Sequence, residues 1–386
     1  MKQPSLIVVL KGKLMPLDNV LPLIVELKKA NYVDDVTLIV TDKKFSTLLH
    51  DQPVFLSAFE TFGLKLCAPS VNEKILGRAI RVLNMLTLIF FRSLLKKTYF
   101  VNFHNFPGFF SCFIELNRLF NGGKAIALEL SPVDSKTQSF VSRFLETEYG
   151  RPAPIRTKVR ADCVLSSHTK SLSFSNSNII HCGYPRGFPT WGSFLLDHAK
   201  DLSLPEKFIF WPLTVLTRQE KNSSHQFSLE TSIAQALNII ADVCPKIAIV
   251  FRYHPTTDVQ KMHSILEASR NKNWKISDSH SIQLIKRCEF VFSTTGTSVF
   301  CDAVQMHKPI VQYSPDKSTF VRKVTSDVYE PLYMNIVDHF FVEPREFGQF
   351  LSTFLENDLS REKSSQVAKS FKTQPIKNII SSLENL

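Results

Sequence analysis

The chain has 386 residues, which is too long for one ordinary hydrophobic core and suits two domains of roughly 150 to 200 residues each. Its 44% hydrophobic and 21% charged residues are typical of a soluble globular protein and exclude a disordered or fibrous class. The formal net charge of +11 favours anionic partners such as nucleotides, phosphorylated lipids or nucleic acid, without choosing among them.

The seven cysteines contain no CxxC pair, and several lie within apolar stretches, as reduced buried thiols do. This pattern predicts a reducing cytosol and no structural zinc. The apolar run LIVVL near Met1 is too short for a signal peptide and is followed by KGK and Pro16, so it predicts a first β-strand. We therefore expect a cytoplasmic protein.

Strand-like apolar runs alternate with helical patterns along the first half of the chain. The strand-like runs are SLIVVL, VTLIV, YFVNF, KAIALEL, ADCVLSS and NIIHCGYP, and VLPLIVELKKA is one of the helical patterns between them. Such alternation predicts βαβ units around a parallel sheet. Residues 1–190 are therefore expected to form an N-terminal Rossmann-like domain.

Within this half, GRAIRVLNMLTLIFFRSLLKK is the most membrane-like segment, although its apolar centre is too short for the roughly 20 residues that span a bilayer. Basic residues flank the centre on both sides: Arg78, Arg81, Arg92, Lys96 and Lys97. Two interpretations stay open. The segment is a core helix with basic ends, or residues 78–97 lie on an anionic membrane surface with Phe and Leu side chains inserted.

Residues 183–205 are rich in Pro, Gly and polar side chains and predict a linker between domains. The alternation then restarts with FIFWPL and continues through IAIVFRYHP, WKISD, FVFSTT and PIVQY, which predicts a second Rossmann-like domain over 205–345. Residues 346–386 read as a helical tail that packs back on the first domain. Two such α/β domains place ligands at the carboxyl ends of their strands, facing a central cleft.

Two groups of polar residues follow strands of the second domain. Arg252, His254 and Pro255 come after IAIVF, where the proline stiffens the loop and the cationic fork and imidazole suit an anion. Ser293, Thr294 and Thr295 follow CEFVF and precede a helix, so hydroxyls and backbone N–H groups gather near a positive helix end. Plain helix capping is the alternative interpretation of the hydroxyls. Together, the two groups predict a phosphate site.

A resemblance to a known family rests on these same stretches. KFIFWPLTVLTRQ, IAIVFRYHPTTD and CEFVFSTTGTSVFCDAVQMHKPIVQY are similar to the second domain of two-domain (GT-B) glycosyltransferases that build bacterial surface polysaccharides. That group includes bacterial sialyltransferases, capsule Kdo transferases and glycerophosphate polymerases. The likeness consists of His-Pro after a strand, Ser/Thr before a helix, and a GKP-like turn, here His307-Lys308-Pro309. It covers about half the chain, and KAIALELSP, ADCVLSS and IIHCGYPRG resemble the end of the first domain more weakly.

The resemblance implies a GT-B fold in which the second domain binds a nucleotide-sugar and the first binds a glycan or lipid-linked glycan acceptor. In the sialyltransferase-like members, the His of His-Pro and the Ser/Thr cluster bind the phosphate of a CMP-sugar, which gives His254, Ser293, Thr294 and Thr295 that role. No metal or further cofactor is then expected, because protein donors offset the charge on the leaving phosphate. Work on such an acceptor would place the protein at the inner membrane face.

Glycosyl transfer also needs a base for the acceptor hydroxyl, or a nucleophile if the configuration is retained. The sialyltransferase-like members place an acidic pair followed by Gly in the first domain, and this chain departs from that pattern with Glu129-Leu130-Ser131. Glu129 is the first candidate, followed by Asp18 in the loop after the first strand and His104 after YFVNF. Their structural alternatives are ion pairing for Glu129, helix capping for Asp18 and an inner, hydrogen-bonded position for His104.

Further residues fall at positions where such folds contact a nucleotide or its sugar. Asp278 follows WKI and is a candidate for the base or ribose, whereas Asp302, inside the helix after the hydroxyl cluster, suits an orienting or solvent-facing role. Thr214, Thr217 and Arg218 follow FIFWPL and are candidates for the donor sugar.

Two other functions stay open at this point. A sugar-nucleotide 2-epimerase shares the two-domain architecture, but it would have no use for a lipid-linked acceptor. A non-enzymatic nucleic-acid-binding protein would suit the net charge of +11, but the sequence has no basic stripe interleaved with aromatics, no helix-turn-helix and no zinc pattern, so nucleic acid is not an expected partner.

Overall fold

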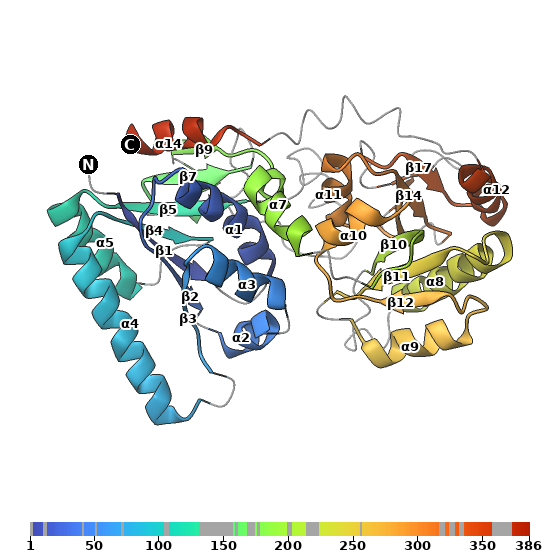
Figure 1. Cartoon of the computed structure of the whole chain (residues 1–386), viewed down its shortest axis with the longest axis horizontal. Coiled ribbons are helices and arrows are strands. Elements are labelled where there is room, and N and C mark those ends of the chain that lie inside the picture. The colour runs from blue at the N-terminus through green and yellow to red at the C-terminus, as the bar shows by residue number, and fades with distance from the viewer. Residues whose placement is uncertain are drawn as a thin grey trace. The chain divides into compact units, whose positions relative to one another are not determined.

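The computed structural model, drawn in Figure 1, divides the chain into two compact units. Unit 1 is built from the described parts of Met1–Ser135, Ser142–Phe194 and Lys372–Leu386, and unit 2 from those of Leu195–Phe371. The residues that the structure describes are 3–10, 14–40, 42–50, 52–70, 73–103, 108–130, 157–158, 161–167, 174–175, 178–198, 203–213, 224–254, 257–315, 321–323, 329–331, 336–356 and 373–386.

Unit 1 has a seven-stranded sheet in the order β3-β2-β1-β4-β5-β7-β9, and every neighbouring pair is parallel. All six residues of β1 and all five of β2 and β4 are buried, as expected for strands that helices cover on both faces. The strands are β1 Ser5–Leu10, β2 Val36–Val40, β3 Lys65–Cys67, β4 Thr98–Asn102, β5 Lys124–Glu129, β7 Cys163–Ser166 and β9 Asn178–His181.

The helices of unit 1 follow the strands as βαβ crossovers, and a short parallel pair, β6 Thr157–Lys158 and β8 Phe174–Ser175, lies outside the main sheet. Between the sheet and helices α4 and α5, the buried cluster includes Ile89, Phe100 and Phe110. The helices are α1 Leu14–Lys29, α2 Lys43–His50, α3 Pro53–Thr61, α4 Ile75–Leu95, α5 Gly108–Asn121, the 3-10 turn η1 Pro185–Gly187, α7 Pro189–Asp197 and α14 Ile376–Glu384.

Residues 184–197 correct the expected linker. Trp191 is fully buried and stacks on Phe55, with ring centroids 6.2 Å apart, and on Phe194 at 5.5 Å. The first turn of α7 is fixed to α1, because the Thr190 N–H donates to Glu26 Oε1 over 2.7 Å. The prediction of a linker across 183–205 is wrong for this stretch, since its aromatic side chains dock into unit 1 despite the many Pro and Gly residues around them.

Unit 2 has a six-stranded parallel sheet in the order β12-β11-β10-β13-β14-β17. Trp211, Phe251 and Phe292 pack in its core, where the Trp211 and Phe292 rings meet edge to face at 4.5 Å. The strands are β10 Phe208–Pro212, β11 Ala248–Arg252, β12 Trp274–Ile276, β13 Val291–Ser293, β14 Ile310–Tyr313 and β17 His339–Phe341, with an antiparallel pair of β15 Val321–Lys323 and β16 Tyr329–Pro331. The helices are α8 Ser224–Val243, α9 Val259–Ala268, α10 Ser281–Arg287, α11 Val299–Gln305 and α12 Pro344–Glu356.

The expected tail over 346–386 is divided between the units. Phe347 of α12 stacks on Tyr313 at 4.7 Å and on Phe292 at 5.3 Å, so α12 belongs to the core of unit 2. In contrast, Ile379 and Leu383 of α14 are buried in unit 1, where the Gln374 N–H donates to the Cys182 carbonyl over 3.0 Å. Phe347, Leu351 and Phe354 are spaced at i, i+4 and i+7 and form one apolar face of α12. This face packs against the sheet of unit 2, which α12 follows in the chain.

Both units therefore have the parallel, helix-covered sheets of Rossmann-like domains, which confirms the predicted fold class. In each sheet the strand order changes direction at one place: between β1 and β4 in unit 1, and between β10 and β13 in unit 2. Ligands of open α/β sheets bind beyond the carboxyl ends of the strands at such a point. The residues that follow these strands are therefore the first place to look for a site.

Candidate functional site

In unit 2, the polar residues predicted from sequence lie around the point where the strand order changes. Pro212 of β10 is in register with Arg252 of β11, and Phe210 of β10 is in register with Val291 of β13. Extending this register by two residues places Ser293 level with Pro212. Because neighbouring strands are about 4.8 Å apart, the Cα atoms of Arg252 and Ser293 lie about 10 Å apart across β10. The residues that follow β11 and β13 therefore lie on either side of the end of β10.

Arg252 and His254 occupy the end of β11 and the loop after it. The Arg252 side chain is fixed by a hydrogen bond from Nη1 to Ser281 Oγ, over 3.1 Å. His254 is exposed, and its carbonyl accepts from the Thr257 N–H over 2.8 Å. Pro255 lies outside the described residues. The loop thus leaves the His254 side chain in contact with solvent.

Tyr253 lies between these two residues and points the other way. Its ring meets His263 edge to face at 6.3 Å, and burial raises the pKa of its hydroxyl to about 12. The hydroxyl is thus protonated at neutral pH. Tyr253 packs against the hydrophobic core of unit 2.

Ser293, Thr294 and Thr295 are almost completely buried, with exposed fractions of 0%, 3% and 1%. Ser293 Oγ accepts from the Thr295 N–H over 3.2 Å, and Ser314 Oγ donates to the Thr294 carbonyl over 2.8 Å. These contacts hold the loop after β13 in one conformation. The three residues thus lie inside the loop rather than on its exposed surface.

Thr297 and Ser298 are the more accessible hydroxyls of the same loop, and both are half-buried. Thr297 Oγ1 accepts from the Val299 N–H over 3.3 Å, whereas Ser298, at the start of α11, makes no side-chain capping bond. Helix capping was the alternative interpretation of the hydroxyl cluster. Of these two residues, Thr297 caps α11, because its hydroxyl accepts from the first N–H of the helix. The sequence STTGTS predicted both residues as members of the hydroxyl cluster, together with Ser293, Thr294 and Thr295.

The GKP-like turn, residues 307–309, contacts the start of β13, the strand that leads into this loop. His307 adopts φ of 53°, a left-handed conformation that favours glycine. Lys308 Nζ donates to the Cys288 carbonyl over 2.6 Å, and the Val291 N–H donates to the Pro309 carbonyl over 2.9 Å. The turn thereby fixes the beginning of β13, the strand whose far end carries Ser293.

The remaining candidates of unit 2 are more scattered. Asp278 is exposed and lies two residues beyond β12, at the same edge of the sheet. Asp302 is 1% exposed within α11, which excludes a solvent-facing role. Thr214, Thr217 and Arg218 lie outside the described residues.

In unit 1, Glu129 ends β5 and is 8% exposed. Its Oε2 accepts from Ser166 Oγ over 3.3 Å, and its carbonyl accepts from Ser167. Ser166 ends the neighbouring strand β7, so the two side chains meet because their strands are paired in register. The carboxylate thus lies at the carboxyl edge of the sheet, as the sequence predicted, with a hydroxyl that orients it.

Asp18 is not in a loop, since α1 begins at Leu14 and encloses it, so the prediction that it follows the first strand as a loop residue or helix cap is wrong. Its Oδ2 pairs with Arg186 Nη1 at 3.4 Å, and the Arg186 side chain is only 5% exposed. Arg186 Nε also donates to Asn19 Oδ1, while Asn19 Nδ2 donates to the carbonyl of Leu130 over 3.0 Å. This chain of contacts brings Asp18 next to the residue that follows Glu129.

Arg186 and Asn19 are the residues of this network that the sequence did not indicate. Arg186 lies in the stretch expected to be a linker, and its partner is 168 positions away in the sequence. His104, the third candidate base, lies outside the described residues. Among the residues that the structure describes, no group of three or more His, Cys, Asp or Glu side chains is arranged to hold a metal ion.

No protein-family model matches the sequence, and no curated protein matches it. Solved structures do match over the whole length. A UDP-GlcNAc 2-epimerase from Neisseria meningitidis, bound to UDP-GlcNAc, is 13% identical with a TM-score of 0.54, covering 99% of each chain. The glycotransferase of kitacinnamycin is 11% identical with a TM-score of 0.51, covering 100% of this chain and 99% of its own.

Arabidopsis thaliana UGT89C1, in complex with UDP, matches to a similar degree, at 11% identity and a TM-score of 0.51 with 99% of each chain covered. At these identities the similarity establishes the fold alone. The chain shares the two-domain α/β architecture of GT-B glycosyltransferases and UDP-GlcNAc 2-epimerases.

Proposed function

We propose that this protein is a glycosyltransferase that transfers a sugar from a nucleotide-activated donor to a glycan acceptor. The observation that carries the proposal is the level arrangement of Arg252 and Ser293 on either side of β10, where the strand order of unit 2 changes direction. An arginine fork and a hydroxyl-lined loop at that position are suited to the phosphates of a nucleotide.

The donor is proposed to be CMP-linked, of the sialic acid or Kdo type, because the His-Pro and Ser/Thr stretches of the sequence resemble the enzymes that use such donors. The epimerase and UGT89C1 structures contain UDP-GlcNAc and UDP, so a uridine nucleotide is the first competitor to test. Asp278, at the same sheet edge, is the proposed contact to the base or ribose.

Bond cleavage leaves negative charge on the nucleotide phosphate. His254 would donate a hydrogen bond to that phosphate, and Arg252 would offset its charge, so the leaving group needs no metal ion. Ser293, Thr294 and Thr295 would contribute through the rigid loop that they form, with the accessible Thr297 and Ser298 nearer to the ligand.

Glu129 is the proposed general base for the acceptor hydroxyl. It is buried at the end of β5, and the hydrogen bond that Ser166 donates to its carboxylate helps to orient it toward an acceptor hydroxyl. Asp18 is less suited to that role, since its carboxylate is already paired with Arg186. The acceptor is proposed to be a bacterial surface glycan, free or lipid-linked, extended at the inner membrane face.

A nucleotide-sugar 2-epimerase is the second candidate, favoured by the full-length similarity to the Neisseria enzyme. The two functions differ in what they require. An epimerase changes the sugar of its nucleotide-sugar without any acceptor, whereas a transferase releases free nucleotide and forms a new glycosidic bond.

The test begins with thermal unfolding of the protein in the presence of CMP, CDP, UDP and GDP, with and without magnesium, because a ligand that binds only the folded state stabilises it by mass action. Stabilisation by CMP without metal supports the proposal. A response to UDP alone, followed by conversion of UDP-GlcNAc without acceptor, would replace it with the epimerase. No response to any nucleotide would reject both.

A further inference from the structure

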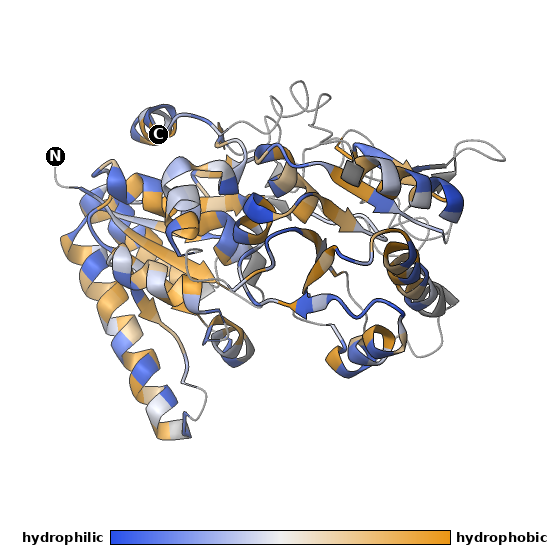
Figure 2. Cartoon of the chain, turned by 45° about the vertical axis from the view of Figure 1, so that its right-hand side comes forward, coloured by the Kyte–Doolittle hydropathy of each residue, from blue (hydrophilic) through white to orange (hydrophobic). Residues whose placement is uncertain are grey.

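Exposed apolar side chains are concentrated on two neighbouring helices of unit 1. Ten large hydrophobic residues of the described chain are exposed, and eight of them belong to α4 and α5. The other two, Ile179 and Val259, lie on separate elements. The eight are Leu76, Ile80, Leu83, Phe90, Phe91 and Leu95 on α4, and Leu119 and Phe120 on α5. In Figure 2, hydrophobic positions recur along α4 between hydrophilic ones.

The spacing of the α4 residues forms one continuous stripe. Positions 76, 80, 83, 87 and 90 follow the i, i+4, i+7 pattern of a single helix face, with Thr87 as the polar residue within it, and the exposed Phe91 and Leu95 lie beside this face. The opposite face, with Met85 and Ile89, is buried against the sheet. A helix of 21 residues is about 31 Å long, so α4 presents a long apolar edge to solvent.

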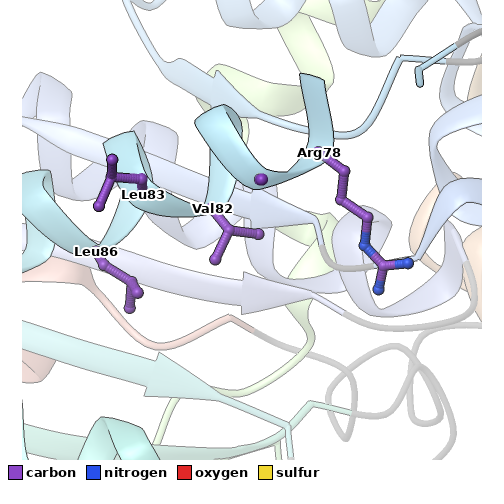
Figure 3. Close-up of a pocket in the computed structure, with 5 residues that line it drawn as sticks. Arg78, Val82, Leu83 and Leu86 are labelled. Atoms are coloured by element: carbon purple, nitrogen blue, oxygen red, sulfur yellow. The ribbon is translucent and has the colours of Figure 1, made fainter. Parts of the chain in front are cut away.

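The first turns of α4 extend beyond the edge of the sheet, as Figures 1 and 2 both show. Residues 76–80 are all exposed, whichever side of the helix they occupy. Beside them is an open groove of about 440 Å³, lined by Arg78, Ala79, Val82, Leu83 and Leu86, of which Figure 3 labels all but Ala79. An arginine at the end of an otherwise apolar groove is arranged like the basic residues that border membrane-bound helices.

The charge around this stripe is positive. Residues 73–97 carry six Lys or Arg side chains and one carboxylate, Glu73. Arg92 pairs with Asp35 and Lys96 with Asp34, which leaves the region net positive after its ion pairs. Lys74 and Arg78, at the protruding end, are exposed. None of the described helices is long and apolar enough to cross a bilayer, so contact would be made from one side.

We propose that the apolar stripe of α4, together with Leu119 and Phe120 of α5, is a docking surface for an anionic lipid bilayer. Leu76, Ile80 and Leu83 insert into the headgroup and acyl boundary, while Lys74 and Arg78 contact lipid phosphates. The C-terminal ends of the two helices lie together, because Asn121 Nδ2 donates to the carbonyls of Ser93 and Leu94. Phe91, Leu95 and Phe120 extend the surface there. Docking does not depend on the reaction that the protein catalyses.

The test is co-sedimentation of the full chain with vesicles, without any nucleotide. We expect binding to phosphatidylcholine vesicles that contain about a third phosphatidylglycerol, and little binding to phosphatidylcholine alone. Leu76→Ser/Leu83→Ser should weaken binding about a hundredfold, because each inserted leucine contributes roughly tenfold. The matched control is Ile179→Ser/Val259→Ser, which removes the two exposed apolar residues elsewhere and should leave binding unchanged.

A charge pair of variants isolates the electrostatic part. Lys74→Glu/Arg78→Glu should weaken binding to the anionic vesicles at least about tenfold, whereas Lys207→Glu/Lys246→Glu, at exposed positions of unit 2, changes the net charge equally and should have a much smaller effect. Thermal unfolding of each variant checks that the fold is intact. Failure of the wild type to sediment with anionic vesicles overturns the proposal. A dimer in solution that Leu76→Ser/Leu83→Ser dissociates also overturns it, since a second copy would then cover the stripe.

Discussion

The two units have sheets of the same kind but differ in the side chains at the carboxyl edges. In unit 1 these include two carboxylates, Glu129 and Asp18, each engaged by a hydroxyl or a guanidinium. In unit 2 they are a fixed arginine, an exposed histidine and a run of hydroxyls. The difference matches the two requirements of sugar transfer: a group that accepts a proton and groups that stabilise a phosphate. The two parallel sheets thus carry different groups at their carboxyl edges: carboxylates in unit 1, and cationic and hydroxyl groups in unit 2.

The largest predicted effect comes from removing the proposed phosphate donor of unit 2. His254→Ala should lower turnover with a CMP-linked donor by about a hundredfold to a thousandfold, because a lost donor to a developing anion costs that much. The side chain is exposed, so the midpoint of thermal unfolding should not change. Turnover is measured as released nucleotide. A rate close to that of the wild type would remove His254 from the site.

The corresponding change in unit 1 is Glu129→Gln. The amide oxygen can still accept from Ser166, so the free energy of unfolding should change by less than about 1 kcal/mol. Transfer should fall by about a hundredfold or more, since the amide cannot accept the proton, while nucleotide affinity stays the same. Ser166→Ala is the control, because it removes only the orienting hydroxyl and should lower transfer far less. Loss of nucleotide binding in Glu129→Gln would contradict the division of roles.

Within unit 1, we expect Asp18 to matter for stability rather than for the proposed transfer reaction. Asp18→Asn should destabilise the protein by about 3 kcal/mol, because it removes a negative charge that pairs with the buried guanidinium of Arg186. Urea unfolding measures the change. Asp34→Asn is the matched control: its pair with Lys96 is about half exposed on both sides, and its loss should cost less than about 1 kcal/mol. Equal losses in the two variants would show that burial does not strengthen the Asp18 pair.

The sequence predicted most strands of both sheets, because fully buried parallel strands are uninterrupted apolar runs such as FIFWP and VTLIV. It failed where tertiary packing decided the outcome. Trp191 and Arg186 lie in a stretch whose Pro and Gly content predicted a linker, yet both are buried by partners more than 100 residues away. The burial of Ser293 could not be predicted either, since a hydroxyl-rich loop after a strand has the same composition whether its hydroxyls are exposed or buried.

For α4 the limit was different. A helix with two apolar faces has the same periodicity whether one face or both are covered, so the sequence favoured a core helix without excluding a membrane-surface helix. The structure shows that one face is buried and the other exposed. The helix pattern predicted the element, and only the position of the neighbouring sheet decided which residues meet solvent.

The smallest predicted effect concerns the turn that supports the loop of unit 2. His307 has φ of 53°, which costs a residue with a side chain roughly 1 to 2 kcal/mol relative to the right-handed region. Glycine removes this cost. Its greater conformational freedom in the unfolded chain, however, lowers the free energy of unfolding by about 0.5 to 1 kcal/mol. His307→Gly should therefore stabilise unit 2 by about 0.5 kcal/mol, measured by urea unfolding. Asn31, at φ of 54° in unit 1, is the matched control. Because asparagine tolerates this conformation better than histidine, Asn31→Gly should be neutral or destabilising, and a larger gain there than at His307 would contradict the argument.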